Sequence, residues 1–165
     1  MSNKMTAWGV GPRLAFISLA YFALAAIVHI SNPGLFVMAE TPHIVFPIVG
    51  TTLIIIGLVL WALAVREIDL AFSEGRLLTR GAYAIVRNPM YSGLVVFVAP
   101  GIALWLRSWP LLTVPLVAGM AFKLLIKKEE NYLEEKFGQA YLDYEARVNA
   151  LVPFVRFPRS LKEQG

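Results

Sequence analysis

The sequence contains no cysteine and little charge. Its 165 residues include no Cys and only two His, and 16% are Asp, Glu, Lys or Arg. The absence of Cys excludes disulfides, thiolate metal sites and a cysteine nucleophile. Soluble domains carry about a quarter charged residues. The low charge, together with 58% hydrophobic residues and a mean hydropathy of +0.64, therefore indicates an integral membrane protein.

The apolar residues fall into four runs, and a helix needs roughly 20 residues to cross the hydrocarbon core of a bilayer. We therefore expect one all-α membrane domain, residues 1–165, with about four transmembrane helices and a cytoplasmic C-terminal segment at 127–165. Arg66 is expected to end the second span, and residues 66–90 are expected to form a connector at the interface. The expected spans are residues 14–30, 44–65, 91–106 and 109–126.

The third and fourth runs are separated only by Arg107 and Ser108. So short a link predicts an antiparallel helical hairpin, with Trp105 and Trp109 at the membrane interface. Pro100-Gly101 interrupts the third run.

The basic residues are distributed unevenly. All except Arg107 and Lys123 fall in the N-terminal segment, the 66–90 connector or the C-terminal segment, and the positive-inside rule then places both termini and the connector in the cytoplasm. Anionic lipid headgroups explain the net charge of +4, so we expect the bilayer as partner and no nucleic acid. His29 and His43 fall on the opposite side and are interpreted as structural, so no metal site is expected.

The segment after the fourth span is charged and amphipathic. Apolar, aromatic and acidic residues recur there at spacings of three and four, which predicts a helix with one apolar and aromatic face that begins with two carboxylates. Gly138 either breaks or caps this helix. The apolar tail at 152–158 is either a lid on the membrane face or an interfacial anchor. The residues of the face are Glu129, Glu130, Leu133, Phe137, Tyr141 and Tyr144.

Ionisable clusters flank the hairpin at Gly81–Gly93 and Lys127–Glu130. Membrane topology alone offers one explanation, in which Arg87 ends a span and the two glutamates pair with neighbouring basic residues. Pro89 favours another, because proline suits the first turn of a helix and disfavours helix at the preceding residue. Arg87 and its neighbours would then surround a helix N-terminus at the cytoplasmic interface. Gly93 suits close approach of either a helix or a ligand.

The order of these residues resembles that of the integral-membrane methyltransferases, which include isoprenylcysteine carboxyl methyltransferase and the phospholipid N-methyltransferases. The resemblance covers roughly residues 50–158, and two blocks in order carry it. They are Gly81-x-Tyr83-x-x-x-Arg87-Asn88-Pro89-x-Tyr91-x-Gly93 and, after the hairpin, Glu129-Glu130-x-x-Leu133-x-x-x-Phe137-Gly138-x-x-Tyr141-x-x-Tyr144.

The resemblance implies a helical membrane fold whose cytoplasmic end binds S-adenosylmethionine without a Rossmann domain. It also implies an activity of the methyltransferase class, EC 2.1.1. The residues that it places at the cofactor are Gly75, Arg76, Leu77, Leu78, Tyr83, Asn88, Pro89, Met90, Tyr91, Glu129 and Glu130. The catalytic candidates are Arg87, Asn88, Tyr91 and Glu130.

Two positions depart from the isoprenylcysteine branch. Asn88 stands where that branch has His, which removes a titrating base but retains hydrogen bonding. Leu125 stands where those enzymes carry an Arg thought to meet the substrate. Both departures count against a prenylcysteine carboxylate as the acceptor.

Methyl transfer from a sulfonium requires alignment of donor and acceptor and exclusion of water, with no covalent enzyme intermediate. Glu129 suits the ammonium or ribose hydroxyls of the cofactor, and Arg87 suits its carboxylate or an acidic headgroup. An amine acceptor must lose a proton, and Glu130, Tyr83 or Tyr91 could assist, tyrosine being the weaker base. The expected acceptor is lipid-like or a small amphiphile, either a phospholipid amine or a prenylcysteine-type carboxylate.

Two other classes of function fit part of the pattern. Membrane sterol reductases share a related Arg-x-Pro-x-Tyr block and would bind NADPH there, although they are usually much longer. A non-catalytic membrane protein of the same fold is the other alternative. Cofactor binding separates these classes.

Overall fold

The computed structural model describes residues 10–38, 44–74 and 76–153, and within these ranges it contains helices and one isolated β-bridge. The elements are α1 (Gly11–Ser31), α2 (Pro33–Phe36), α3 (Val45–Glu74), α4 (Ala82–Ile85), α5 (Pro89–Ser92), a π-helical segment η1 (Gly93–Val98), α6 (Ala99–Trp105), a 3-10 turn η2 (Pro110–Thr113), α7 (Val114–Leu125), α8 (Lys127–Phe137) and α9 (Gln139–Arg147).

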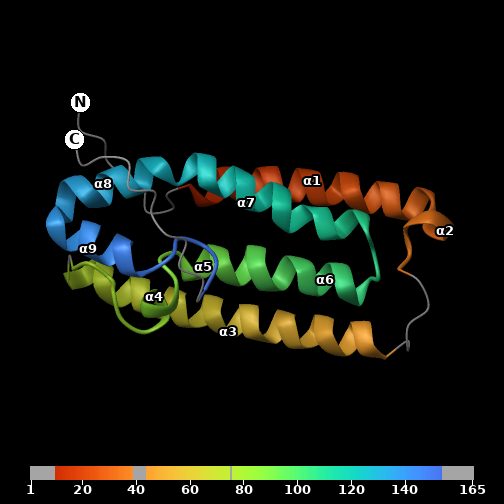
Figure 1. The fold of residues 1–165 in the computed structure, drawn as a ribbon, viewed down its shortest axis with the longest axis horizontal. Helices are drawn as coiled ribbons and strands as arrows, with labels where there is room; N and C mark the ends of the chain where they lie inside the picture. The colour runs from red at the N-terminus through yellow and green to blue at the C-terminus, as the bar shows by residue number, and fades with distance from the viewer. Residues whose placement is uncertain (1–9, 39–43, 75, 154–165) are drawn as a thin grey trace.

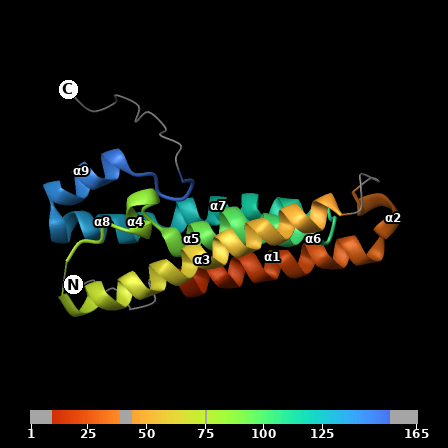
Figure 2. The ribbon, with the colours of Figure 1, turned by 90° about the horizontal axis from the view of Figure 1, so that it is seen from below.

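Four helical rods run along the long axis of the molecule. Figure 1 shows α1, α3, α6 and α7 side by side, with α2 at one end and α4, α8 and α9 at the other. Figure 2 shows the same grouping after a quarter turn. α3 packs along η1 and α6, and α1 packs along α7. The two arms of the hairpin therefore each have a long helix as their main neighbour.

Two helices are long and apolar enough to cross a membrane, Gly11–Ser31 and Val45–Ile68, which confirms the first two expected runs as helices of spanning length. A third candidate arises if Pro110–Leu125 and Lys127–Phe137, which are bent by 42°, form one span. The helix Pro89–Trp105 is apolar but shorter. Many large apolar side chains on these rods are exposed, as expected of an integral membrane protein whose outer surface faces lipid.

The third rod consists of α5, η1 and α6, residues 89–105, and is continuous despite Pro100. Pro89 occupies the first turn of α5, as predicted. Proline lacks an N–H and its ring clashes with the carbonyl four residues earlier in an α-helix. The wider π-helical turn of η1, directly before α6, relieves this conflict. The apolar run is interrupted in sequence, but the helical path is not broken.

Two glycines bring α3 and the third rod into backbone contact. A Cβ atom on Gly57 would lie 2.5 Å from the carbonyl oxygen of Gly93, and a Cβ atom on Gly93 would lie 2.5 Å from that of Gly57. No other residue fits at either position without moving a helix. Gly93 therefore meets a helix, which is the packing role of small residues in membrane proteins.

The hairpin turn is confirmed and is tied to the loop after α1. Arg107 adopts a positive φ of 51°, its carbonyl oxygen accepts the Met38 N–H at 2.8 Å, and its Nη2 donates to the Met38 carbonyl oxygen at 2.8 Å. Ser108 is fully buried and bridges to Val37. Trp105 and Trp109 are 54% and 57% exposed at this end of the bundle.

One expectation about element boundaries is wrong. Arg66 ends the apolar part of α3 but not the helix, which continues to Glu74, because the end of an apolar stretch does not break backbone hydrogen bonding. The amphipathic segment after the fourth span forms two helices, and the predicted role of Gly138 at a helix end is confirmed. Gly138, at φ 55°, lies between α8 and α9. Most of the proposed tail at 152–158 lies outside the described residues.

Candidate functional site

The connector after α3 is held at its sharpest point by Glu67. The Ala82 N–H donates to Glu67 Oε1 at 3.0 Å. Gly81 has a φ of 58°, and a Cβ atom there would lie 1.8 Å from Glu67 Oε1. Both the backbone conformation and the space taken by the carboxylate therefore require glycine. Glu67 was not predicted from the sequence, because its contact depends on α3 continuing past Arg66.

Tyr83, an expected cofactor contact, lies in the protein core. Its side chain packs with Leu60, Ala64 and Val86 and is 9% exposed. Its carbonyl oxygen accepts the Tyr144 hydroxyl at 2.6 Å. Burial, and secondly the nearby Glu67, raise the pKa of Tyr83. A phenol that resists ionisation in this way is a poor general base at neutral pH.

The other expected cofactor residues of the connector have mixed positions. Leu78 packs against the cluster that contains Tyr83. Leu77 is half-buried and Arg76 is exposed. Gly75 lies outside the described residues.

Arg87 joins the two motif blocks. Its Nη2 lies 3.0 Å from Glu130 Oε1, and its Nη1 lies 2.9 Å from Glu145 Oε1 and donates to the Tyr141 hydroxyl at 3.0 Å. The guanidinium is largely buried, and its Nε has no partner among the described residues. Burial, opposed by Arg87, raises the pKa of Tyr141 to about 12. Tyr141 is therefore a neutral hydrogen-bonding group at physiological pH.

Asn88 joins the start of α5 to the segment after α9. The Arg87 N–H donates to the Asn149 carbonyl oxygen at 2.7 Å, and the Asn88 N–H and Nδ2 both donate to the Ala150 carbonyl oxygen, at 3.1 and 3.0 Å. Pro89 is fully buried. The predicted Asn-Pro block thus anchors the return of the chain over the site.

Glu129 faces the beginning of α1. The Val10 N–H donates to Glu129 Oε1. Burial raises the pKa of Glu129, the Val10 hydrogen bond lowers it, and the neighbouring Glu130 raises it. Tyr91 lies close by: its hydroxyl is hydrogen-bonded to the backbone of Gly11 and is near enough to feel the Glu129 carboxylate. The carboxylate is therefore held by the protein in a partly desolvated setting.

The structure gathers most of the expected site at one end of the bundle. Arg87 forms an ion pair with Glu130, and Tyr91 lies close to Glu129. Met90 is partly buried on the core cluster of Tyr83. The structure also adds residues that were not predicted to belong to the site. Two of these are the tyrosines of α9, and their spacing of three residues on the amphipathic face could have indicated them. The added residues are Val10, Glu67, Tyr141, Tyr144 and Glu145.

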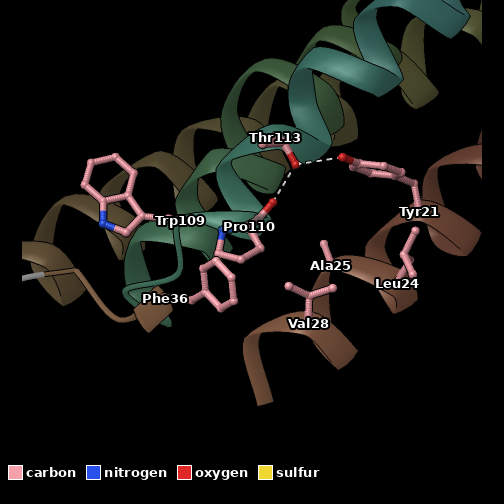
Figure 3. Close-up of a pocket in the computed structure, with 8 residues that line it drawn as sticks. All are labelled: Tyr21, Leu24, Ala25, Val28, Phe36, Trp109, Pro110 and Thr113. Carbon is pink, nitrogen blue, oxygen red and sulfur yellow. Dashed lines mark hydrogen bonds between the residues drawn. The ribbon is translucent and has the colours of Figure 1, made fainter. Parts of the chain in front are cut away.

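The described residues also line a hollow of about 400 Å³ far from this site. Figure 3 shows it between α1 and η2, where Tyr21 and Thr113 form a hydrogen bond of 3.0 Å. Its lining is apolar and includes Trp109, which belongs to the hairpin turn at the opposite end from Arg87. It contains none of the motif residues. The site is therefore defined by the convergence of the two motif blocks and not by the size of a hollow.

The predicted absence of a metal site was not contradicted. The described residues contain no group of three or more His, Cys, Asp or Glu side chains that could hold a metal ion. His29 lies in α1 with a buried Nδ1 that has no partner among these residues. His43 lies outside them.

Comparison with known proteins points to one family. Residues 45–140 match the family model described as phospholipid methyltransferase. Protein-S-isoprenylcysteine O-methyltransferase B of Arabidopsis thaliana is 30% identical over 115 residues, which are 64% of this chain and 58% of that protein. A probable protein-S-isoprenylcysteine O-methyltransferase of Oryza sativa subsp. indica is 34% identical over 118 residues, which are 65% of this chain and 61% of that protein.

The matched region thus spans about 60% of the length of these relatives. The family model covers α3 to the start of α9, including the first motif block and the second block as far as Gly138. It does not include α1, whose first residues contact Glu129. Since the family match covers more than half of the chain, the chain belongs to the phospholipid and isoprenylcysteine methyltransferase family of membrane proteins.

Proposed function

We propose that this protein transfers a methyl group from S-adenosylmethionine to a lipid-like or small amphiphilic acceptor at the cytoplasmic face of a membrane. The observation that carries the proposal is the ion pair of 3.0 Å between Arg87 and Glu130. It joins the two sequence blocks that mark the family. The names of the relatives support the same reaction class.

The proposed topology has four spans, with both termini, the 66–90 connector and α8–α9 in the cytoplasm. The third of these spans, Pro89–Trp105, is short, but it lies between longer helices and carries Gly93 at its contact with α3. A short helix can be accommodated by local thinning of the bilayer at modest cost. This arrangement puts the ion pair of Arg87 and Glu130 on the side richest in Lys and Arg.

The residues at the end of the bundle near α4, α8 and α9 have the chemical groups that S-adenosylmethionine needs. Glu129 offers a partly buried carboxylate for an ammonium or for ribose hydroxyls, and Tyr91 offers a hydroxyl beside it. When bound, S-adenosylmethionine supplies an electrophilic methyl group. The protein has to hold the donor and acceptor in line and keep water away. The Arg87 backbone N–H and Asn88, which anchor the segment at 149–150, close one side of this region.

Arg87 has a positioning role in this proposal. Its two terminal nitrogens already bind Glu130, Glu145 and Tyr141. It therefore orients Glu130 and α9, which differs from the direct grip on the cofactor carboxylate expected from sequence. If the methyl acceptor is an amine, Glu130 is the proposed general base that takes its proton. The raised pKa of Tyr83 makes that residue unsuitable as the base at neutral pH.

Direct binding tests the proposed cofactor. The purified protein in detergent is titrated with S-adenosylhomocysteine and, separately, with NADPH by calorimetry. Binding of S-adenosylhomocysteine at micromolar concentration without binding of NADPH supports a methyltransferase. The reverse result would show a reductase, and binding of neither would leave a non-catalytic member of the fold.

The acceptor is identified from the product. Membranes containing the protein are incubated with S-adenosylmethionine labelled in the methyl group, and the extracted product is treated with base. A methyl ester releases volatile labelled methanol, whereas an N-methyl group stays with the lipid. The relatives' names favour an ester, while Asn88 and Leu125 favour an amine, so this single assay separates the two acceptor classes.

A further inference from the structure

The first turn of α1 reaches into the proposed cofactor site from outside the family match. Val10 and Glu129 are 119 positions apart, yet the Val10 N–H donates to Glu129 Oε1. The family model begins at residue 45. The contact therefore comes from a helix that the family motif does not include.

This turn is fixed by packing as well as by the hydrogen bond. Val10 and Leu14 are buried with Phe122 and Ile126, and Tyr91 packs against the same cluster. The Tyr91 and Phe122 rings lie 5.4 Å apart. The Val10 amide is thus presented to the carboxylate by a rigid apolar contact and does not need the hydrogen bond to stay in place.

The second residue of the turn is also involved. The backbone of Gly11 is hydrogen-bonded to the Tyr91 hydroxyl, and a Cβ atom on Gly11 would lie 3.5 Å from that oxygen. Consecutive backbone groups of α1 therefore meet the two side chains, Glu129 and Tyr91, that the proposed function places at the cofactor. A side chain free to rotate must be ordered when a ligand binds, and ordering costs affinity.

We propose that the Val10 amide positions Glu129 for the cofactor, so that α1 completes the binding site. The amide fixes one carboxylate oxygen and directs the other towards a cationic or hydroxyl group of the ligand. This inference rests on the proposed function, because it takes Glu129 as a cofactor ligand. Val10 is a positioning residue, and its contribution comes from the backbone and not from its side chain.

A proline at this position removes only the relevant donor. Val10 has a φ of −80°, which lies within the range that proline adopts, and the carbonyl oxygen that accepts the Leu14 N–H at 3.0 Å is retained. Val10→Ala is the control, since it also replaces the buried valine side chain but keeps the N–H. Folding of both variants is compared by circular dichroism and gel filtration in detergent.

The measurement is the dissociation constant of S-adenosylhomocysteine as a function of pH. We expect V10P to bind about tenfold more weakly than V10A at neutral pH, because a hydrogen bond to a charged group is lost. An amide that donates to a carboxylate lowers its pKa. Binding that needs ionised Glu129 is lost as the pH falls through that pKa, so the loss should occur at higher pH in V10P.

The pH profile separates positioning from simple structural support. Among residues 10–38, 44–74 and 76–153, the titratable groups that face Glu129 are Glu130, Tyr91 and Tyr83, and both variants keep all of them. If α1 only supports the fold, V10P will bind weakly but with the pH midpoint of V10A. Equal affinity and equal midpoints in the two variants would likewise overturn the inference.

A measurement without ligand keeps this test distinct from that of the proposed function. The side-chain carboxyl carbon of Glu129 is titrated by NMR in protein with labelled glutamate, and Glu129→Gln identifies its signal. A higher pKa in V10P than in V10A shows the amide contact, and identical titrations refute it. A wild-type protein that binds no S-adenosylhomocysteine would overturn the proposed function and with it the role in binding.

Discussion

At the scale of single residues, the charged side chains of the candidate site are held by ion pairs, hydrogen bonds and close contacts with other residues of the protein. Arg87 is held by two carboxylates and a hydroxyl, and Glu67 is wedged against Gly81. Removing one member of a buried charged pair leaves the other desolvated and unpaired, which costs more than the pair contributes. Each of these residues therefore has an effect that extends beyond its own contacts.

We expect Glu129→Ala and Tyr91→Ala to abolish binding of S-adenosylhomocysteine while leaving a folded protein in detergent. Glu129 would lose the carboxylate for the cofactor, and Tyr91 would lose both its hydroxyl and its ring contact with Phe122. Binding is measured by calorimetry, with Glu134→Ala, an exposed carboxylate on the same helix, as control. Retained binding in both variants would mean that these residues only pack.

Gly81→Ala is expected to lower the free energy of unfolding by about 2 kcal/mol or more, because alanine is strained at a φ of 58° and its Cβ would displace Glu67. Gly34→Ala is the control, since nothing lies within 4 Å of a Cβ atom there. Thermal unfolding in detergent measures both. A melting temperature for Gly81→Ala equal to that of the control would show that the connector relaxes around the new methyl group.

At the scale of elements, sequence patterns predicted the helices better than their contacts. Apolar runs located α1 and α3, Pro89 marked the start of the third rod, and Gly138 marked the break before α9. The continuation of α3 past Arg66 was not predictable from hydropathy, because a charged residue ends burial in lipid without ending a helix. The contact of Val10 with Glu129 was also missed, since a backbone amide leaves no signature in the sequence.

The position of α9 depends on Arg87. We expect Arg87→Gln to weaken the attachment of α9, because Glu145 and Glu130 would lose their ion pair, and hydrogen exchange at residues 139–150 should accelerate at least tenfold. Arg147→Gln is the control, because its guanidinium donates to the Asp143 carbonyl oxygen within the same helix. Unchanged exchange in Arg87→Gln would indicate that the backbone bonds of Asn88 alone hold this segment.

At the scale of the whole molecule, the contacts of Arg87 with Glu130 and Glu145 lie at one end of the bundle. The hairpin turn and α2 lie at the other end (Figure 1), and the apolar hollow lies there too. In the proposed function, a lipid-like acceptor keeps its apolar part beside the helices while its head reaches the motif residues. The exposed apolar side chains on α1 and α3 provide such a boundary with lipid.

The absence of cysteine permits a direct test of topology. A single Cys introduced at Leu35 on α2 or at Lys136 on α8, both exposed, would be the only thiol in the protein. In right-side-out membrane vesicles, an impermeant maleimide should label Leu35→Cys at once and Lys136→Cys only after the vesicles are opened. The proposed topology has three spans between the two positions, an odd number, which puts them on opposite sides. Labelling of both from the same side would contradict that topology and the positive-inside orientation.

The long sequence separations within the site also bear on its biosynthesis. Arg87 and Asn88 find their partners 54 to 62 positions later, at Tyr141, Glu145 and Ala150. At about 5–20 residues per second, the ribosome needs several seconds to make that stretch. Residues 89–105 are therefore synthesised well before residues 139–150, which cover Arg87 in the folded protein. During that interval the Arg87 side chain is exposed to water or bound by a chaperone. Mutations that weaken the attachment of residues 139–150 should consequently lower the yield of inserted protein as well as its activity.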